Sequence, residues 1–540
     1  MSDNKKKVSD KPYPKILKNK VYLYLTEFFS GMSVMAVELG ASRLLAPYFS
    51  SSQIVWTIII GTIMIAMALG NIFGGKSADK NPDPDKLYGR ILVAGVWIAA
   101  IPFVGKFAVM GISALLVVTV NTNFLIWAAF ITCMAVFVFP LFLLGTVTPS
   151  LVKYTIDSLD DSGKTVGMLN ASNTIGSIIG TFVPTFISIP TVGTAVTFLI
   201  FSGILLILGI TYFISLKKGA AKITASVLLF AICCGLSPSL GFAFWEKDLA
   251  YEGESVYNYL QVKDNDRRTA LSTNVLFGVQ SVYMKSGELT GMYYDYAMAA
   301  PLMADTDDTV DILVLGMGTG TYAKQCMKYF DGVTAEGVEI DEKIIELSRR
   351  YFELPDEVKV TAYDGRAFLN VCDKKYDVIM VDAYQDITIP FQMSSKEFFA
   401  QVRSHLNDGG VMVCNMNMRS KENDGINTYL ADTIASEFSE VFTVDVGGST
   451  NRELFASNDP QMAERFIEKS AELENSELYS LMSQVNDGLS EYKAGKLILT
   501  DDKAPVELLG MSVIDDLIQE ELSYYKKRFK EDGIKGLLEG

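Results

Sequence analysis

The sequence predicts an α-helical membrane domain with several spans, followed by an α/β domain with a doubly wound parallel sheet. Long apolar runs recur between residues 21 and 244, each close to the roughly 20 residues that cross a bilayer. Beyond residue 310, strand-like and helix-like segments alternate, which is typical of a parallel sheet. The 540 residues suffice for both parts, and a composition of 49% hydrophobic and 20% charged residues excludes a disordered or fibrous protein.

Charge is divided unevenly between the two parts. Residues 1–245 contain 18 Lys and Arg and 10 Asp and Glu, a net charge of +8, whereas residues 246–540 contain 29 and 53, a net charge of −24. A half with this much negative charge repels phosphates, so we expect no nucleic-acid partner. The same field attracts polycations and steers them towards an acidic cleft.

The cysteines and the single histidine favour neither a metal site nor a disulfide framework. None of the six cysteines has the paired spacing of a zinc site, and His405 lies in a polar stretch typical of a helix end. We therefore expect free thiols, a structural histidine and no metal. The cysteines are Cys133, Cys233, Cys234, Cys326, Cys372 and Cys414.

Residues 21–244 are predicted to form the transmembrane domain, after a polar, basic tail at 1–20 that does not resemble a cleavable signal peptide. We expect seven spans, or eight if the third run breaks at Gly105-Lys106. Basic loops place the N-terminus inside the cell. Seven crossings then leave the acidic half outside and eight bring it inside. The runs are 21–46, 54–73, 91–120, 124–147, 167–189, 192–215 and 223–243.

Charged and small residues inside these runs have specific expected roles. Glu27, Glu38 and Arg43 lie within or at the end of the first span, where charges are costly and usually face a partner or a wet cavity. A helix-packing ion pair and a ligand site are equally compatible with them. Gly176-x-x-x-Gly180 supplies a small face for close helix contact.

The second half is expected to contain three parts. Residues 245–300 show short alternating runs with turn signals and predict a small antiparallel β unit. Residues 301–460 form the nucleoside-binding α/β domain, and residues 461–540 a helical C-terminal extension. The predicted strands of the main sheet lie near 310–316, 335–340, 358–363, 376–383, 411–416, 441–446 and 452–457.

Four successive strands of this sheet end in glycine-rich or acidic turns. The first ends in a turn containing Gly316, Gly318 and Gly320, which lets a ligand approach the backbone. A carboxylate about 20 residues on can hold two ribose hydroxyls. Open α/β sheets bind ligands at the carboxyl ends of their strands, so these turns predict one shared site. The acidic residues of the next three turns are Glu339, Asp364 (followed by Gly365), and Asp382 with Asp386.

These residues resemble the spermidine synthase family, the aminopropyltransferases, over roughly residues 252–460. The whole chain resembles membrane-fused spermidine synthase-like proteins, in which a multi-span domain precedes the synthase domain. The resemblance implies a Rossmann-like sheet of the class I methyltransferase type. The segments that carry it are Ser30-Gly31 to Glu38, Ala68-Leu69-Gly70 to Asp79, Glu254-Ser255-x-Tyr257, Leu289-Thr290-Gly291-x-Tyr293-x-Asp295, Asp382-Ala383-Tyr384 to Ile389-Pro390, and Leu499-Thr500-Asp501-Asp502-x-Ala504-Pro505-Val506.

The resemblance also implies a reaction and roles for individual residues. An amine attacks the propyl carbon of decarboxylated S-adenosylmethionine, and methylthioadenosine leaves; no metal takes part. Asp382 resembles the catalytic base and Asp386 the acid that binds the amine. Glu339 would bind the ribose, Asp364 with Gly365 the adenine, and Gly316, Gly318 and Gly320 would line the sulfonium side. Tyr257, Tyr293, Asp295 and Tyr384 would form the pocket walls.

Two alternatives to a polyamine-forming aminopropyltransferase stay open. Thr319 stands where spermidine synthases commonly have an acid that disfavours the carboxylate of ordinary S-adenosylmethionine, so a methyltransferase using that cofactor is one. A polyamine transporter or sensor without turnover is the other. The expected partners are a polyamine such as putrescine, the lipid bilayer and a second copy of the chain in a homodimer. We expect a multi-pass cell-membrane protein whose catalytic domain is cytoplasmic because of its ligand, although loop charges leave this side open.

Overall fold

The chain divides into two compact units, which we describe separately. One comprises the chain up to Phe244 except residues 50–52 and 117–124, and the other comprises those short segments and Trp245–Gly540. The computed structural model describes residues 14–49, 52–120, 123–155, 162–238, 241–244, 246, 248–275, 279–306, 309–384, 389–417, 419, 425–511, 513–514 and 527.

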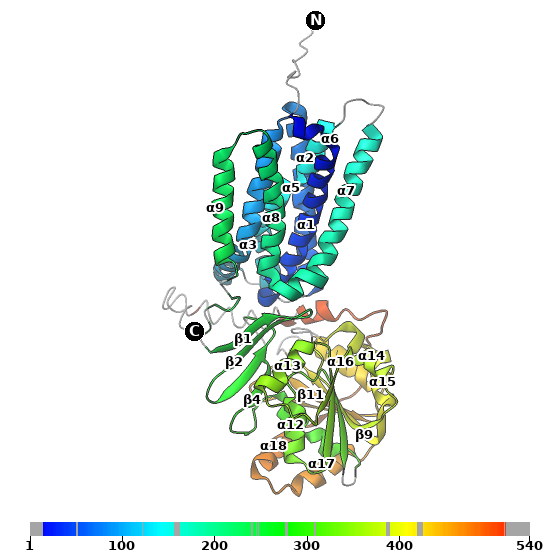
Figure 1. The fold of residues 1–540 in the computed structure, drawn as a ribbon. Helices are drawn as coiled ribbons and strands as arrows, with labels where there is room; N and C mark the ends of the chain where they lie inside the picture. The colour runs from blue at the N-terminus through cyan, green and yellow to red at the C-terminus, as the bar shows by residue number, and fades with distance from the viewer. Residues whose placement is uncertain are drawn as a thin grey trace. The chain divides into compact units, whose positions relative to one another are not determined.

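The first unit is built from helices alone over its described residues (Figure 1). Its π-helical turn η2 joins α7 to α8, and Gly193 has a φ of 79°, which marks a kink inside α8. The elements are η1 (Lys15–Lys18), α1 (Lys20–Phe49), α2 (Gln53–Lys80), α3 (Pro84–Thr119), α4 (Phe124–Val136), α5 (Val138–Gly145), α6 (Val147–Thr155), α7 (Ser162–Val183), η2 (Pro184–Ser188), α8 (Ile189–Ser215) and α9 (Ala220–Leu236).

Five helical stretches of the described chain are long and apolar enough to cross a membrane, which is compatible with a multi-pass membrane protein. Two shorter apolar helices, α4 and α9, fall on the fourth and last predicted runs. The five stretches are Lys20–Phe49, Gln53–Lys80, Pro84–Leu116, Val138–Thr155 and Gly163–Ser215.

The break at Gly105-Lys106, one of the two alternatives that the sequence leaves open, does not occur, because α3 continues through both residues. A Cβ on Gly105 would meet Cδ2 of Leu44 at 2.9 Å, so the glycine permits close packing of α3 on α1. Lys106 is buried, and its ammonium lies 4.5 Å from the ring centroid of Phe242. The buried charge of Lys106 therefore makes a cation–π contact, at a point where the sequence leaves a helix break open.

Small residues bring α7 against α1, as predicted. Any Cβ on Gly176 or Gly180 would collide with the backbone carbonyl of Phe28 or Met32. The same helices share a buried polar contact, in which the carboxylate of Glu27 accepts hydrogen bonds from the Thr148 hydroxyl at 2.5 Å and the Asn173 amide at 2.9 Å. In the first unit Glu27 therefore links α1, α6 and α7.

The second unit begins with the predicted antiparallel β unit. Its four strands form a meander in the order β1-β2-β3-β4, and every neighbouring pair is antiparallel. The strands are β1 (Leu249–Glu254), β2 (Tyr259–Asp264), β3 (Arg268–Ser272) and β4 (Val279–Met284).

The main sheet has eight strands in the order β12-β10-β11-β9-β8-β5-β6-β7. Strands β5 to β9 are parallel, but β10 and β11 are antiparallel, which corrects the expectation of a wholly parallel sheet. Residues 446–451 are too few for the crossover that a parallel pair requires, so the last two long strands form a hairpin. The strands are β5 (Val310–Leu315), β6 (Val333–Glu339), β7 (Lys359–Ala362), β8 (Tyr376–Val381), β9 (Leu406–Met416), β10 (Glu440–Asp445), β11 (Arg452–Ser457) and β12 (Ser490–Glu491).

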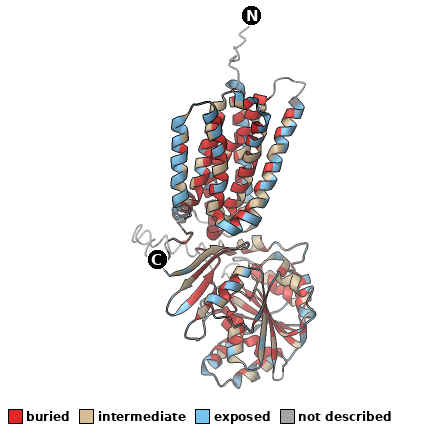
Figure 2. Ribbon diagram, in the orientation of Figure 1, coloured by how far each residue is buried: buried red, intermediate tan, exposed pale blue. Residues whose placement is uncertain are grey.

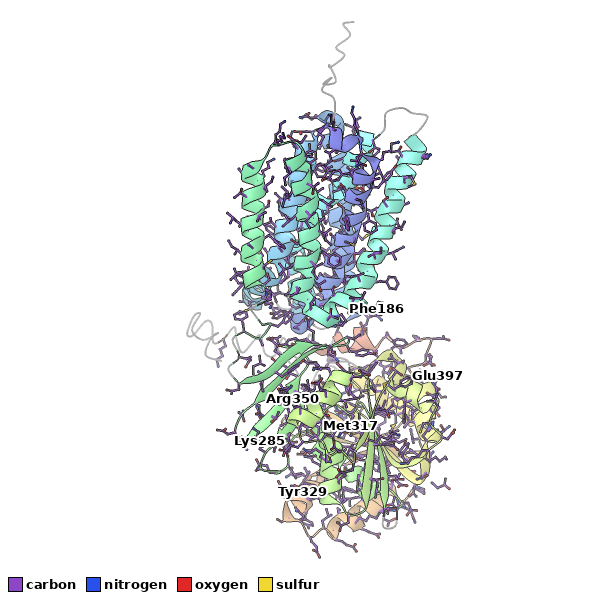
Figure 3. All side chains as sticks on the ribbon, viewed as in Figure 1. Phe186, Lys285, Met317, Tyr329, Arg350 and Glu397 are labelled. Carbon is purple, nitrogen blue, oxygen red and sulfur yellow. The ribbon has the colours of Figure 1, made fainter. Side chains whose placement is uncertain are left out.

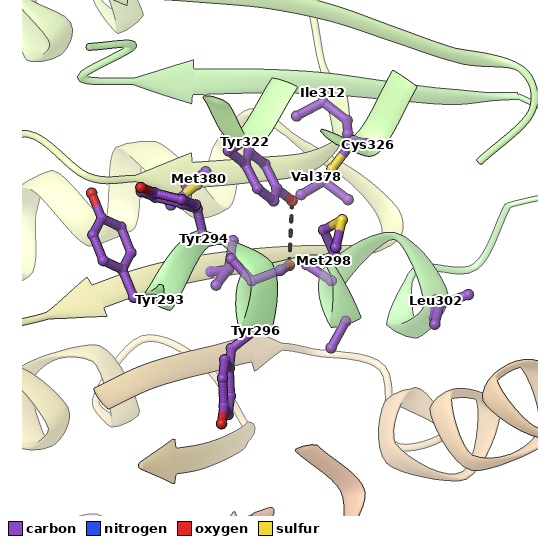
Figure 4. Close-up of a cluster of buried hydrophobic side chains, with 14 of the residues drawn as sticks. Tyr293, Tyr294, Tyr296, Met298, Leu302, Ile312, Tyr322, Cys326, Val378 and Met380 are labelled. Carbon is purple, nitrogen blue, oxygen red and sulfur yellow. Dashed lines mark hydrogen bonds between the residues drawn. The ribbon is translucent and has the colours of Figure 1, made fainter. Parts of the chain in front are cut away.

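The strands of this sheet form the buried core of the second unit, with helices around it (Figure 2). On one face Tyr322 of α12 packs among Tyr294, Met298 and Leu302, and its hydroxyl donates to the carbonyl of Ala297 at 3.4 Å (Figure 4). This packing holds α10 in place on the sheet. The helices are α10 (Tyr293–Ala297), α11 (Ala299–Met303), α12 (Thr321–Tyr329), α13 (Glu342–Tyr351), α14 (Gly365–Leu369), η3 (Phe391–Met393), α15 (Lys396–Ser404), α16 (Gly425–Ala435), α17 (Met462–Ala471) and α18 (Ser476–Gly488).

Candidate active site

A cavity of about 310 Å³ lies at the carboxyl ends of the parallel strands. Its walls include one residue or more from each turn that follows β5, β6, β7 and β8. The four turns that the sequence analysis grouped therefore surround one shared space. The predicted site residues that line it are Tyr257, Tyr293, Gly316, Gly318, Glu339, Asp364, Gly365, Asp382 and Tyr384.

Glycine is required in the turn after β5. Gly316 has a φ of 87°, and a Cβ there would lie 2.5 Å from the carbonyl oxygen of Asp382. Met317, labelled in Figure 3, packs against Gly337, where a Cβ would meet its sulfur at 2.6 Å. Gly320 does not line the cavity. It precedes α12 with a φ of 79°, so its part is to begin that helix.

Glu339 is held by two backbone donors at the end of β6. Its Oε2 accepts from the Gly318 amide at 2.9 Å, and its Oε1 accepts from the Asp341 amide at 3.1 Å. Asp341 in turn caps α13 and accepts a hydrogen bond from Ser255 at 2.5 Å. Burial raises the pKa of Glu339 to about 7, although the two amide donors oppose this shift. The arrangement fixes a carboxylate with free lone pairs beside the glycine turn.

Asp364 caps the short helix α14, because its Oδ1 accepts from the Ala367 amide at 2.8 Å. Asp364 and Gly365 both line the cavity on the side of β7. The cap fixes the orientation of the carboxylate, which is suited to accept hydrogen bonds from a flat polar ligand such as a nucleobase.

Asp382 accepts two side-chain hydrogen bonds in the turn after β8. The Tyr293 hydroxyl donates to Oδ2 at 2.6 Å, and the Asn415 amide donates to Oδ1 at 2.8 Å. Burial raises the pKa of Asp382 to about 7 and the charge of Glu339 adds to the shift, whereas both hydrogen bonds lower the pKa. A carboxyl group that titrates near neutral pH is suited to take up a proton during a reaction.

The predicted tyrosines line the cavity, whereas Asp295 does not. Tyr384 lines the cavity, and its hydroxyl donates to the carbonyl of Asn415 at 2.5 Å. Asp295 does not line the cavity: it is fully buried and accepts hydrogen bonds from Gly291, Thr290 and Gln325. The expectation that Asp295 forms a wall is wrong, because residues two apart on the helix α10 face different directions. Asp386 lies outside the described residues.

Two polar residues near Asp382 were missed by sequence reasoning. Asn415, on β9, extends the network, since its Oδ1 accepts from Asn451 at 2.8 Å. Glu453, on β11, is buried, and neither carboxylate oxygen has a hydrogen-bond partner among the described residues. Burial, with the charge of Asp382, raises the pKa of Glu453 well above its usual value. The sequence did offer a signal for both residues, because each is a polar residue next to apolar residues of its strand.

The acidic limb of the pH profile tests the hydrogen bond to Asp382. We expect kcat/KM to fall as pH drops through about 7, because protonated Asp382 cannot accept a proton. Tyr293→Phe removes a donor that stabilises the carboxylate, so the midpoint should rise by about one pH unit. Tyr294→Phe is the control, since its hydroxyl contacts the Val282 amide instead. An unchanged midpoint in Tyr293→Phe would contradict the assignment.

Comparison with known proteins places this site in a family. Residues 291–447 match the spermine/spermidine synthase domain. The chain is 53% identical over 345 residues to a probable polyamine aminopropyl transferase of Bifidobacterium longum, an alignment that covers 61% of this chain and 77% of that protein. The chain belongs to the polyamine aminopropyltransferase family. As a member of that family the chain is a transferase, and its parallel strands and glycine turn form a Rossmann-like domain.

Other known proteins are similar to this chain over part of its length. A polyamine aminopropyltransferase of Vibrio vulnificus is 24% identical over 304 residues, covering 53% of this chain and 99% of that protein. Among solved structures, a probable spermidine synthase from Corynebacterium glutamicum aligns with a TM-score of 0.36 and 17% identity, over 47% of this chain and 99% of that one.

Proposed function

We propose that the second unit of this polyamine aminopropyltransferase transfers the aminopropyl group of decarboxylated S-adenosylmethionine to a diamine or polyamine such as putrescine. The observation that carries the proposal is the single cavity shared by Glu339, Asp364 and Asp382. The resemblance to the family assigns these three carboxyl groups to the ribose, the adenine and the attacking amine. The family membership supports a polyamine as the substrate class.

The proposed reaction needs only side-chain chemistry. The amine gives a proton to Asp382, and its lone pair attacks the propyl carbon bonded to the sulfonium sulfur. That carbon–sulfur bond breaks, its electron pair remains on sulfur, and methylthioadenosine leaves. The proton on Asp382 is then released to water, which restores the carboxylate. Tyr293 and Asn415 hold Asp382 in a fixed orientation for this transfer.

Charge supports a cationic substrate over an anionic one. Residues 246–540 carry a net charge of −24, and the described residues that line the cavity include Glu339, Asp364 and Asp382 but no lysine or arginine. A polycation is therefore attracted to this cleft, while the carboxylate of ordinary S-adenosylmethionine is repelled there. Thr319, which replaces the acid common in spermidine synthases, is buried and meets the Thr321 hydroxyl at 3.3 Å. Because Thr319 is uncharged, the repulsion that an acid at this position would add is missing.

A paired titration of the full-length protein tests the co-substrate. We expect decarboxylated S-adenosylmethionine to bind at least tenfold more tightly than S-adenosylmethionine, a difference of about 1.4 kcal/mol. Product mass after incubation with putrescine should show the gain of an aminopropyl group. Gain of a methyl group, or equal affinity for both ligands, would refute the proposed reaction. Thr319→Asp should widen the preference by restoring the repulsive charge.

We further propose that residues 21–244 form the membrane domain, after the basic tail at 1–20. The proposal extends to a β unit at 245–300, a catalytic domain at 301–460 and a C-terminal extension at 461–540, with the catalytic part in the cytoplasm where its substrates occur. The five long apolar stretches support membrane anchoring. Retention in the membrane pellet after an alkaline wash is the expected result, and release of the chain into the supernatant would contradict it. A homodimer stays a prediction.

A further inference from the structure

A groove of about 680 Å³ lies on the first unit between α3 and α9, with α5 at its floor. Helix α9 packs mainly on α8, and its side chains are largely exposed (Figure 2). The groove is therefore open along one side of α9. Its apolar lining residues include Leu92, Val93, Val96, Trp97, Phe139, Leu143 and Leu229.

One end of the groove is cationic. Lys86 and Arg90 extend from the first turns of α3, and Lys222 extends from the first turn of α9. Asp85 is the single acid among the lining residues, and it accepts a hydrogen bond from the Tyr212 hydroxyl at 2.6 Å. The lining thus carries three positive charges and one negative charge at this end.

Local contacts hold two of the cations at the rim. The Arg90 guanidinium donates to the Ser77 hydroxyl at 3.1 Å and lies 5.1 Å from the centroid of Phe73. The Lys222 ammonium lies 5.0 Å from the centroid of Phe213. Lys86 is less constrained, since its closest acid, Asp83, is 3.8 Å away. The first two cations are therefore positioned before any ligand arrives.

Gly89 leaves space between these cations. A Cβ at this position would meet only the Lys222 ammonium, at 3.5 Å, so no other described side chain fills the space. Fourteen helical residues separate Lys86 from Ala100 at the far end of the groove, a length of about 21 Å. One leaflet of hydrocarbon is about 15 Å thick, so the groove is long enough for an acyl chain.

We propose that this groove binds an anionic phospholipid, with its phosphate over Gly89 among Lys86, Arg90 and Lys222 and an acyl chain along the apolar wall. The inference rests on the membrane placement proposed above. Charge complementarity selects the occupant: a zwitterionic lipid offers less net attraction, and a soluble anion gains nothing from the apolar wall.

Binding to the full-length, delipidated protein in detergent tests the proposal. Native mass spectrometry with phosphatidylglycerol should show a retained lipid, and phosphatidylcholine at the same concentration should give much less. The triple variant Lys86→Gln, Arg90→Gln, Lys222→Gln should weaken retention of phosphatidylglycerol about a hundredfold, since each cation near an anionic surface contributes about fivefold. The matched control Lys18→Gln, Lys20→Gln, Lys164→Gln removes three exposed charges outside the groove and should bind like the parent.

Two glycine variants distinguish binding in the groove from a general effect of charge. Gly89→Leu fills the space between the cations without changing charge and should also abolish selective retention. Gly111→Leu, on the same helix in open space, should not. Equal retention of both lipids, full retention in Gly89→Leu, competition by glycerol phosphate at equal concentration, or a dimer that retains no lipid would each overturn the proposal. Because the alkaline-wash assay reads membrane anchoring separately, loss of lipid selectivity with anchoring intact counts against the groove alone.

Discussion

Asp382→Asn is expected to lower kcat by about 10³-fold while the affinity for the adenosyl co-substrate stays within a few-fold. General-base catalysis contributes typically 10²- to 10⁴-fold, and an amide cannot take up the proton of the attacking amine. Asn keeps the size of the side chain and can still accept a hydrogen bond from Tyr293, which lies 2.6 Å from the carboxylate. Single-turnover rates and calorimetry measure the two effects separately.

Asp373→Asn is the matched control for that variant. Asp373 is exposed and does not line the cavity, so its change removes one negative charge of the same domain without touching the site. We expect parental kcat in this control. If Asp382→Asn transferred the aminopropyl group at the parental rate, Asp382 could not be the base, and proton transfer to bulk water would have to be considered.

Glu339→Gln is expected to weaken binding of the adenosyl co-substrate about a hundredfold. The carboxylate accepts one backbone amide on each oxygen, from Gly318 and from Asp341. A glutamine has a single acceptor oxygen, so one of these amides would face an NH₂ group and lose its partner. Hydrogen bonds to a charged group contribute about 1.5–3 kcal/mol each, and the ribose hydroxyls lose the same acceptor.

Glu342→Gln separates this effect from a general loss of charge. Glu342 is exposed at the first turn of α13, three positions further along the chain. Calorimetry with methylthioadenosine should show parental affinity in Glu342→Gln and weak binding in Glu339→Gln. A thermal melt of each variant reports whether the glycine turn itself is destabilised. Parental nucleoside affinity in a folded Glu339→Gln protein would disprove the ribose assignment.

Features that repeat along the chain were predictable because they follow local physics. Apolar runs of membrane length and the positions of the strands β5 to β11 need only hydropathy and alternation. The grouping of Glu339, Asp364 and Asp382 was also predictable, because parallel strands bring their carboxyl ends to one edge of a sheet. Recognition of the family rested on the spacing of these same residues.

The departures from these predictions have both distant and local causes. Asp295 was expected in the cavity wall, but the helix α10 directs it towards Gln325. A break at Lys106 was left open, yet α3 is continuous there and the Lys106 ammonium lies over the ring of Phe242. In the hairpin of β10 and β11, the strand β11 runs opposite to the direction expected for it. The contacts of Gln325 with Asp295 and of Phe242 with Lys106 join segments distant in sequence, whereas the hairpin follows from the short connection at 446–451.

By itself the sequence determined the membrane-like and acidic halves, the strands and the acidic residues at their ends, since these depend on neighbours along the chain. Tertiary structure alone decided the protonation of Asp382, because its donors Tyr293 and Asn415 come from α10 and β9 and its burial from the walls around it. Only the folded structure also showed the cationic end of the α3–α9 groove. Desolvation and hydrogen bonding depend on which atoms surround a group, and that is known only after distant segments have packed.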